Sequence, residues 1–176
     1  ATASGGFLFT HRGYSGPAVL DVSHVAVRST PGGANAARLS VCWTPRDAAG
    51  WMRALSASGG RSVLGTVREE LPERLALALI EAAGVSAERT LAELRREERA
   101  ALIEMLVRCP LPWSGDEGYA KAEVTGGGVS LAEIDPRTME SRLHRNLFLC
   151  GELLDAFGPI GGYNFLWAWA TGRAAG

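Results

Sequence analysis

The sequence predicts a mixed α+β fold. Three observations support this: short aromatic and aliphatic runs near the start, helical periodicity across residues 47–122, and strand-like runs after Gly118. The order of these segments is strand, helix, strand, helical stretch, strands, helix. Because strands and helices do not alternate one by one, we expect an α+β arrangement rather than a regular βαβ series.

The first segment of the chain predicts a strand, a helix and a second strand. Residues 6–10 have the aromatic and aliphatic content of a short strand. A helix is expected at residues 16–28, where Ser15 can act as the N-cap and Pro17 falls in the first turn, whose N–H groups need no helical partner. The run Pro31-Gly32-Gly33 would end this helix. Residues 38–43 alternate apolar and polar side chains, as a half-buried strand does.

The middle of the chain predicts a helical subdomain of three or four helices. Leu71, Leu75 and Leu79 recur at the spacing of one helix face. Thr90 and Glu93 form the T-x-x-E pattern of a capping box ahead of a second apolar run. The charged side chains between these apolar positions would lie on the solvent-facing side of the helices.

After Gly118 the chain predicts strands again. They are expected at residues 120–125, 129–134 and 147–150, which are rich in aliphatic side chains. The three glycines at 126–128 allow either a tight bend or a close approach of backbone between the first two strands.

Composition limits the classes of partner. The 176 residues carry a formal net charge of −1, so no overall field attracts nucleic acid or anionic lipid. Arginines and aromatic residues do not form a dense patch, which also argues against nucleic acid. No apolar run is long enough to span a membrane. We therefore expect no nucleic acid and no membrane among the partners.

The three cysteines do not suggest a metal or disulfide framework. Cys42, Cys109 and Cys150 are an odd number and contain no C-x-x-C pair, which favours reduced thiols in a cytoplasmic protein. No metal-ligand cluster is visible in the sequence. The chain begins at Ala1 without a methionine and stops at Gly176 within an expected helix, so we expect it to be a piece of a longer protein.

The last third of the chain has the pattern of half a cofactor site. Glu152 follows a hydrophobic run and Gly151, and an acid at a strand end can accept hydrogen bonds from sugar-like hydroxyl groups. Gly161 and Gly162 precede an apolar helix, where bare glycines let backbone N–H groups approach an electron-rich ligand. The alternatives are an exposed acid without a ligand and an ordinary glycine-capped loop.

Three blocks of the sequence resemble one known family. They are LFTHRGYSGPAVL at 8–20, KAEVTGGGV at 121–129 followed by EIDPRTMES at 133–141, and the block from GE at 151–152 through GGYN at 161–164 to TG at 171–172. In this order they resemble the aminoacetone-oxidase-like family of FAD-binding flavoproteins, a group of NAD(P)/FAD-dependent oxidoreductases.

The resemblance implies a domain organisation. Residues 1–44 and 108–122 would form a β-barrel-like insert domain, and residues 45–107 a helical insert within it. Residues 123–176 would form the C-terminal part of a Rossmann-like FAD-binding domain. The family's N-terminal dinucleotide-binding domain, with its GxGxxG turn, would precede Ala1 and is absent from this chain. We expect that missing domain to be a partner of this chain.

The resemblance also implies which residues contact the cofactor. The cofactor-binding residues are expected to be Gly151, Glu152, Asp155, Gly158, Gly161, Gly162, Tyr163, Asn164, Thr125, Gly127 and Gly128.

Several of these roles have alternatives. Glu152 would bind a hydroxyl of the ribityl chain, whereas Asp155 either holds the loop or reaches that chain. Asn164 either hydrogen-bonds the cofactor or caps the helix. Thr125, Gly127 and Gly128 either pass close to the isoalloxazine ring or form a plain hairpin turn.

The resemblance implies the activity of an FAD-dependent oxidoreductase. Hydride would pass between the flavin and a small organic substrate, with NAD(P)H as a possible electron donor. His11 is the candidate catalytic residue, although a lone histidine is more often a packed or hydrogen-bonded residue. We expect this chain to be inactive without the rest of the protein. The alternative is a non-catalytic module that binds protein or RNA and keeps a vestigial flavin motif.

Overall fold

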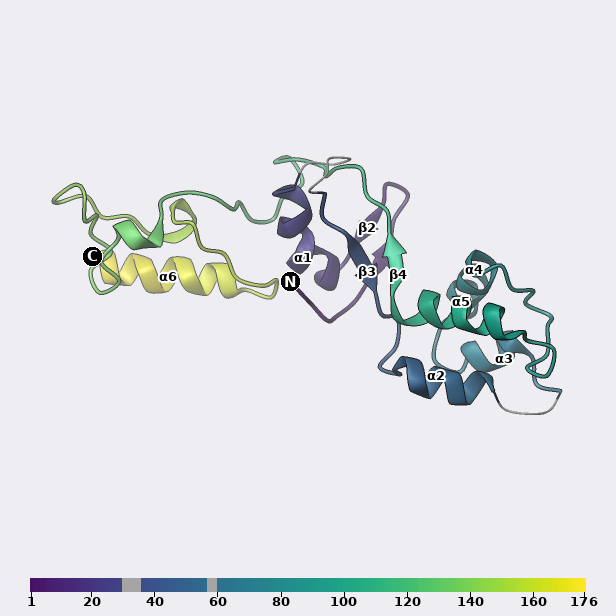
Figure 1. Cartoon of the computed structure of the whole chain (residues 1–176). Coiled ribbons are helices and arrows are strands. Elements are labelled where there is room, and N and C mark those ends of the chain that lie inside the picture. Colours follow the sequence, from purple (N-terminus) through teal and green to yellow (C-terminus); the bar gives the residue numbers. More distant parts are fainter. Residues whose placement is uncertain (30–35, 57–59) are drawn as a thin grey trace. The chain divides into compact units, whose positions relative to one another are not determined.

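The computed structural model describes residues 1–29, 36–56 and 60–176, which divide into two compact units (Figure 1). The terminal unit comprises Ala1–Ala37 and Ser114–Gly176, and the helical unit comprises Arg38–Trp113. The assignment of these stretches to an insert domain and to part of a cofactor-binding domain stays a prediction.

Four helices are found among the described residues of the helical unit. They are α2 (Ala48–Leu55), α3 (Val63–Val67), α4 (Glu73–Ala82) and α5 (Arg96–Val107). Asp47 caps α2 by accepting a 2.7 Å hydrogen bond from the Gly50 N–H, and Ser62 caps α3 through the Gly65 N–H at 3.0 Å. Helical periodicity in the middle of the chain therefore predicted the secondary structure of this region.

A single apolar core holds the four helices together. Trp51, Leu55, Ile80, Leu102 and Leu106 are fully buried within it. The Trp51 indole also donates a 3.2 Å hydrogen bond to the Thr44 hydroxyl, and the Arg46 guanidinium lies 4.8 Å from the centre of its ring.

The predicted details of the helices need two corrections. Leu71 is buried in the core but lies before α4, because Pro72 occupies the N-cap of that helix and the helical hydrogen bonds begin after it. The T-x-x-E pattern closes a turn rather than a helix. The Glu93 carboxylate accepts from the Thr90 N–H at 2.9 Å, whereas α5 begins later, at Arg96.

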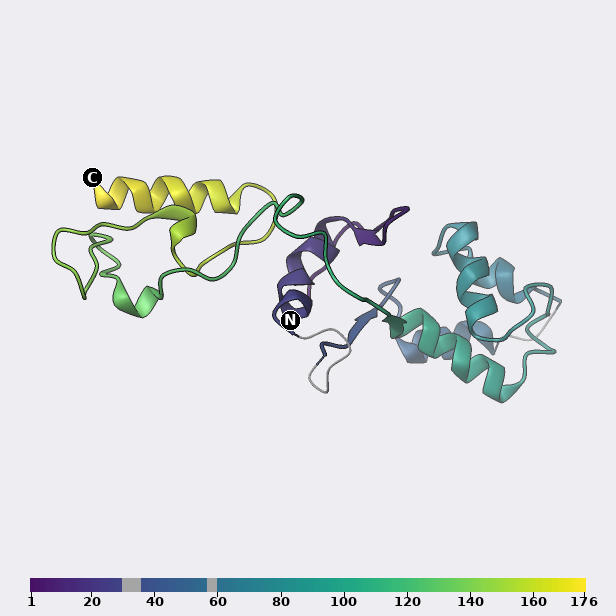
Figure 2. The same cartoon turned by 90° about the horizontal axis from the view of Figure 1, so that it is seen from above.

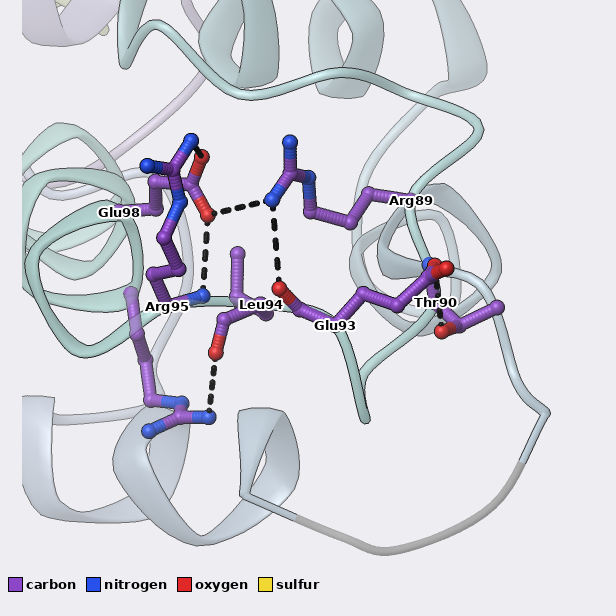
Figure 3. A network of polar contacts seen from close by, with 7 residues as sticks. Arg89, Thr90, Glu93, Leu94, Arg95 and Glu98 are labelled. Carbon is purple, nitrogen blue, oxygen red and sulfur yellow. Dashed lines mark hydrogen bonds and ion pairs between the residues drawn. The ribbon is translucent and has the colours of Figure 1, made fainter.

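A polar network joins that turn to the start of α5 (Figure 3). The Arg89 guanidinium donates to the Glu98 carboxylate at 3.1 Å and to the Glu93 carbonyl oxygen at 3.2 Å. The same Glu98 carboxylate accepts from the Arg95 N–H at 2.9 Å, one of the N–H groups left without a helical partner at the start of α5. The charged run that was expected to solvate the surface therefore also fixes local structure.

Two short strands pair beside the helices. β3 (Leu39–Val41) is antiparallel to β4 (Cys109–Leu111), with Leu39 opposite Leu111 and Val41 opposite Cys109. The predicted strand at 38–43 is thus confirmed in a shorter form.

The terminal unit begins with a hairpin and a helix. β1 (Leu8–Phe9) pairs antiparallel with β2 (Tyr14–Ser15), and α1 (Pro17–Val27) follows. The N-cap of α1 is Gly16 rather than Ser15, and Pro17 lies in the first turn as predicted. Gly16 is required there because φ is +98° and a Cβ atom would lie 2.6 Å from the Gly6 carbonyl oxygen.

The rest of the terminal unit contains mostly irregular backbone and one long helix. Two 3₁₀ turns, η1 (Leu131–Glu133) and η2 (Gly151–Leu153), precede α6 (Tyr163–Ala175). α6 runs beside η2 in both views (Figures 1 and 2). A small core of Ile134, Met139 and Leu154 packs against Trp167 on α6.

The three strands predicted after Gly118 are wrong. Residues 120–125 contain no strand, residues 129–134 contain η1, and residues 147–150 form only the single bridge of Phe148 to Glu140. A strand is stable only beside a partner strand, and the described segments meet each other at isolated positions such as Val129 and Leu154.

The described residues do not form the β-barrel-like arrangement that the resemblance implied. Their sheets are two separate pairs of strands, each with two open edges. The predicted helix end at Pro31-Gly32-Gly33 lies outside the described residues. Across residues 1–29, 36–56 and 60–176, no helix has the length and apolar character needed to cross a membrane.

Candidate functional site

Gly151 lies against α6 through its backbone. Its N–H donates a 2.9 Å hydrogen bond to the buried hydroxyl of Thr171, and its carbonyl oxygen accepts one of 3.1 Å from the indole of Trp167. A Cβ atom on Gly151 would lie 3.6 Å from the Ala168 side chain, and φ is +66°. This glycine therefore brings the 3₁₀ turn η2 into close contact with the helix.

The next residue turns its side chain toward a different segment. The exposed carboxylate of Glu152 accepts a 2.6 Å hydrogen bond from the Thr125 N–H. Glu152 and Thr125 were both predicted site residues, and the structure brings them together across 27 positions of sequence. A carboxylate has about four lone-pair directions, so this bond leaves Glu152 with further capacity to accept.

Asp155 holds the glycine-rich bend at residues 126–128. One carboxylate oxygen accepts from the Gly127 N–H at 3.1 Å and from the Arg28 guanidinium at 3.4 Å. Of the two roles open for Asp155, holding the loop is thus the one for which the structure gives contacts.

Gly128 allows two backbone segments to meet. The Val129 N–H donates to the Leu153 carbonyl oxygen at 2.9 Å, and the Asp155 N–H donates to the Val129 carbonyl oxygen at 2.8 Å. A Cβ atom on Gly128 would lie 2.6 Å from the Leu153 carbonyl oxygen, with φ at +136°. The bare Cα of Gly128 is therefore explained by this close approach of backbone.

A glycine-rich turn leads into α6. Asn164 closes it from both sides, since its side-chain oxygen accepts from the Gly158 N–H at 2.7 Å and its side-chain nitrogen donates to the Gly158 carbonyl oxygen at 3.1 Å. A Cβ atom on Gly158 would lie 2.9 Å from the Tyr163 Cβ atom. Asn164 thus ties the turn to the first turn of the helix.

The N-terminus of α6 has no side-chain cap. Gly162 occupies the N-cap in the left-handed region, with φ at +94°, and Gly161 has φ at +117°. The first helical turn contains no acidic residue, and a Cβ atom on Gly162 would meet nothing within 4 Å. This leaves space beside the positive end of the helix dipole, where an electron-rich group can bind the N–H groups.

His11 is not joined to these residues. It is exposed in the turn between β1 and β2, and among the described residues no hydrogen bond or ring contact connects it with either glycine-rich segment. Within the same described ranges, no three His, Cys, Asp or Glu side chains gather as a metal site requires.

Sequence patterns missed the contribution of α1 to this region. Asp21 and His24 of α1, and Arg28 at its C-cap, contact the segment between Asp155 and Ile160. Their spacing places them on one helix face, which was a usable signal, but polar residues on a helix face do not reveal which segment they meet.

The comparison with protein families identifies the group to which the sequence belongs. The family described as "HI0933-like protein Rossmann domain" matches residues 14–176. The chain belongs to the HI0933-like family. Members of this family bind FAD. The match extends over both compact units and over all the residues of the glycine-rich bend and turn.

The relatives to which this chain is similar carry two kinds of name. The chain is 38% identical over 167 residues to the ribosomal RNA dihydrouridine synthase of Escherichia coli K12, and 32% identical over 179 residues to that of Haemophilus influenzae. Both matches cover 95% of this chain and 40% of the relative. A 3-dehydro-bile acid delta(4,6)-reductase of Clostridium scindens is 39% identical over 105 residues, which cover 60% of this chain and 26% of that protein.

This HI0933-like chain therefore spans well under half the length of these relatives. The residues present fit one side of an FAD site. The uncapped start of α6 offers backbone N–H groups beside open space, and Glu152 offers an exposed carboxylate.

Proposed function

We propose that this chain is the C-terminal portion of an FAD-dependent reductase, and that residues 151–164 with the bend at 125–128 form one wall of its flavin site. The main observation that supports the proposal is the N-terminus of α6, which has no side-chain cap. It directly follows Gly161 and Gly162, both of which have positive φ. The other wall would come from the dinucleotide-binding domain that the resemblance places before Ala1.

Each residue of this wall has a physical task. The aligned N–H groups at the start of α6 would stabilise the negative charge that gathers at the pyrimidine edge of a reduced flavin. Glu152 would accept a hydrogen bond from a ribityl hydroxyl with the lone pairs that Thr125 leaves free. Gly158 and Asn164 would keep the turn rigid, so that no reorganisation is needed when the cofactor binds. The bound flavin itself supplies the two-electron chemistry.

The names of the relatives support reduction as the direction of the reaction. Dihydrouridine is uridine with its C5–C6 double bond reduced, and a delta(4,6)-reductase removes double bonds in a 3-oxo steroid. In both substrates the double bonds that are reduced are conjugated with a carbonyl group. Conjugation makes the alkene carbon farther from the carbonyl group electron-poor, so that carbon can accept hydride. We therefore favour a double bond conjugated with a carbonyl group as the substrate, rather than the amine that an aminoacetone-oxidase-like activity would use.

Two substrate classes remain candidates. A uracil base of ribosomal RNA is favoured by the two relatives that match 95% of this chain, including the helical unit. A small unsaturated ketone is favoured by the bile acid reductase, whose match covers 60% of the chain. The first candidate departs from the expectation of a small organic substrate without nucleic acid. That expectation rested on the net charge and on the lack of a dense patch of arginines and aromatic residues.

The test uses the full-length protein that contains this chain. A visible flavin absorption spectrum after purification separates a flavoprotein from a non-catalytic interaction module. The flavin is then reduced with NADH or NADPH in the absence of oxygen, and its reoxidation is followed after addition of ribosomal RNA or of an unsaturated 3-oxo steroid.

The matched control is the same RNA in which the reactive uridine is already dihydrouridine. Reoxidation by the uridine RNA and not by the control supports the first candidate, whereas reoxidation by the steroid supports the second. A colourless protein that binds no FAD would contradict the proposal.

A further inference from the structure

We infer that Asp21 and His24 of α1, together with Arg28 at the C-cap of that helix, are positioning residues for the turn that leads into α6. Their role in cofactor binding rests on the proposed function, whereas their contacts with the turn do not. None of the three lies in the glycine-rich segments or was expected to belong to the site.

Asp21 makes the most direct of these contacts. Its carboxylate accepts a 2.8 Å hydrogen bond from the Ile160 N–H, across 139 positions of sequence. Ile160 immediately precedes Gly161, whose φ of +117° begins the turn into the helix. A hydrogen bond to a charged acceptor is stronger than one between neutral groups, so Asp21 restrains the backbone at the entrance to the turn.

Arg28 acts on the other end of the same segment. Its ion pair with Asp155 is 3.4 Å long, and the two side chains are 56% and 43% exposed, so the pair by itself contributes little. The same Asp155 oxygen also accepts from the Gly127 N–H, however. Arg28 therefore binds the Asp155 carboxylate, which already links the 126–128 bend to the residues before the turn.

Phe157 lies in the sequence between Asp155 and Ile160, and its ring contacts both α1 and the C-cap residue of that helix. The Arg28 guanidinium is 5.8 Å from the centre of the Phe157 ring, and the His24 ring is 5.2 Å from it in an edge-on arrangement. A Cβ atom on Gly126 would approach the Phe157 ring to 3.2 Å, so the bend packs against the same ring.

The spacing of the three side chains lets them contact the same loop. Positions 21, 24 and 28 repeat at intervals of three and four residues, which places them along one face of α1. They meet the loop at Ile160, Phe157 and Asp155, in the reverse order along the chain. The placement of the Gly161 and Gly162 N–H groups thus depends on α1 as well as on α6.

The first experiment measures amide hydrogen exchange in the full-length protein without added FAD. In Asp21→Ala, we expect exchange of the Ile160 amide to become at least about tenfold faster, because its N–H loses a charged acceptor. Asp21→Asn keeps an acceptor oxygen and should recover part of the protection. Ser23→Ala is the matched control, because Ser23 lies on α1 and bonds only to the Leu20 carbonyl oxygen.

The second experiment measures a property that a merely structural role would not change. In Asp21→Ala, the dissociation constant for FAD should rise about tenfold and the flavin reduction potential should become more negative, since misplaced N–H groups stabilise the reduced flavin less. Ser23→Ala should change neither quantity. If Asp21→Ala fails to fold, Arg28→Met replaces it, with faster exchange of the Gly127 amide as the expected result.

The outcomes separate this inference from the proposed function. Unchanged exchange at Ile160 in a folded Asp21→Ala protein would overturn the contact. Faster exchange together with unchanged FAD affinity and potential would overturn the positioning role. A wild-type protein that binds no FAD would overturn the proposed function and the positioning role, while the exchange data would still decide the contact.

Discussion

The Thr171 hydroxyl on α6 lies 2.9 Å from the Gly151 nitrogen and accepts its N–H, while donating to the Trp167 carbonyl oxygen at 2.7 Å. Thr171 is only 4% exposed, so water cannot replace it as a partner. We expect Thr171→Val to leave the Gly151 N–H unsatisfied and to lower the free energy of unfolding by about 1–3 kcal/mol. Urea unfolding measures this, and Thr171→Ser, which keeps the hydroxyl, is the control. Equal stability of the two variants would contradict the role of this bond.

Gly127 and Gly128 provide a matched pair that separates backbone strain from steric collision. Both have positive φ, at +84° and +136°, but only at Gly128 would a Cβ atom strike backbone, at 2.6 Å. Gly127→Ala should therefore cost about 1–2 kcal/mol of stability. Gly128→Ala should cost more and release the bend from Leu153. Thermal unfolding of both variants checks this. If Gly127→Ala is as unstable as Gly128→Ala or more so, the close approach at Gly128 is not the constraint.

Glu152 should contribute to FAD affinity in the full-length protein. Glu152→Ala removes a charged acceptor and should weaken FAD binding by about 1.5–3 kcal/mol, measured by flavin fluorescence titration. Glu152→Gln keeps an oxygen that can accept from the Thr125 N–H and removes only the charge. If both variants bind FAD like the wild type, Glu152 does not belong to the site.

The helical unit should lose stability in acid. Hydrogen bonding from the Arg95 N–H, together with the charges of Arg89 and Arg95, lowers the pKa of Glu98 below its ordinary value of 4.5. Bonds from the Thr90 N–H and hydroxyl lower the pKa of Glu93 in the same way. A carboxylate whose pKa is lowered in the folded state stabilises that state above pH about 4.5, and this contribution is lost as the pH falls through the lowered pKa.

The variant Glu98→Gln should therefore be less stable than the wild type at neutral pH and should differ less from it at about pH 3. Tryptophan fluorescence during urea unfolding, to which the buried Trp51 contributes, measures this difference. If the free energies of unfolding of the two proteins differ by the same amount across this pH range, Glu98 does not cause the loss of stability in acid.

The 176-residue chain by itself should bind FAD weakly or not at all. In the proposed function its glycines and Glu152 form one wall of the FAD site, and this sequence contains no GxGxxG turn to hold the pyrophosphate. Phe165, Leu166 and Trp169 are 75%, 65% and 77% exposed on α6, so the isolated chain should also self-associate. Calorimetric titration with FAD and light scattering test both points. Tight stoichiometric binding would show that the residues of this chain suffice for the FAD site.

Local patterns predicted the helices of this chain better than its strands. Pro17 and the apolar positions after it marked α1 within one residue at each end, since helical hydrogen bonds form within the segment itself. The run at 120–125 has strand-like composition but no partner strand among the described residues. Strand pairing depends on segments that are distant in sequence, and composition does not reveal them.

The same distinction applies to the candidate site. The resemblance to a flavoprotein family selected Thr125, Gly127, Glu152 and Asp155. The structure joins Thr125 to Glu152 and Gly127 to Asp155 by hydrogen bonds. The bond between Asp21 and Ile160 spans 139 positions and involves a backbone N–H, which every residue except proline carries. No local pattern can select such a partner, so the contribution of α1 required the folded structure.

The pairing of Val41 with Cys109 has a consequence for how this protein can change over evolution. Paired residues of two antiparallel strands lie about 4.5–5.5 Å apart, so the chain leaves for its four helices and returns at nearly the same point. A tight turn of about two residues could join the ends of β3 and β4 directly. One insertion or deletion between β3 and β4 can therefore add, remove or replace the helices as a unit. The pairing register of the two strands would stay the same.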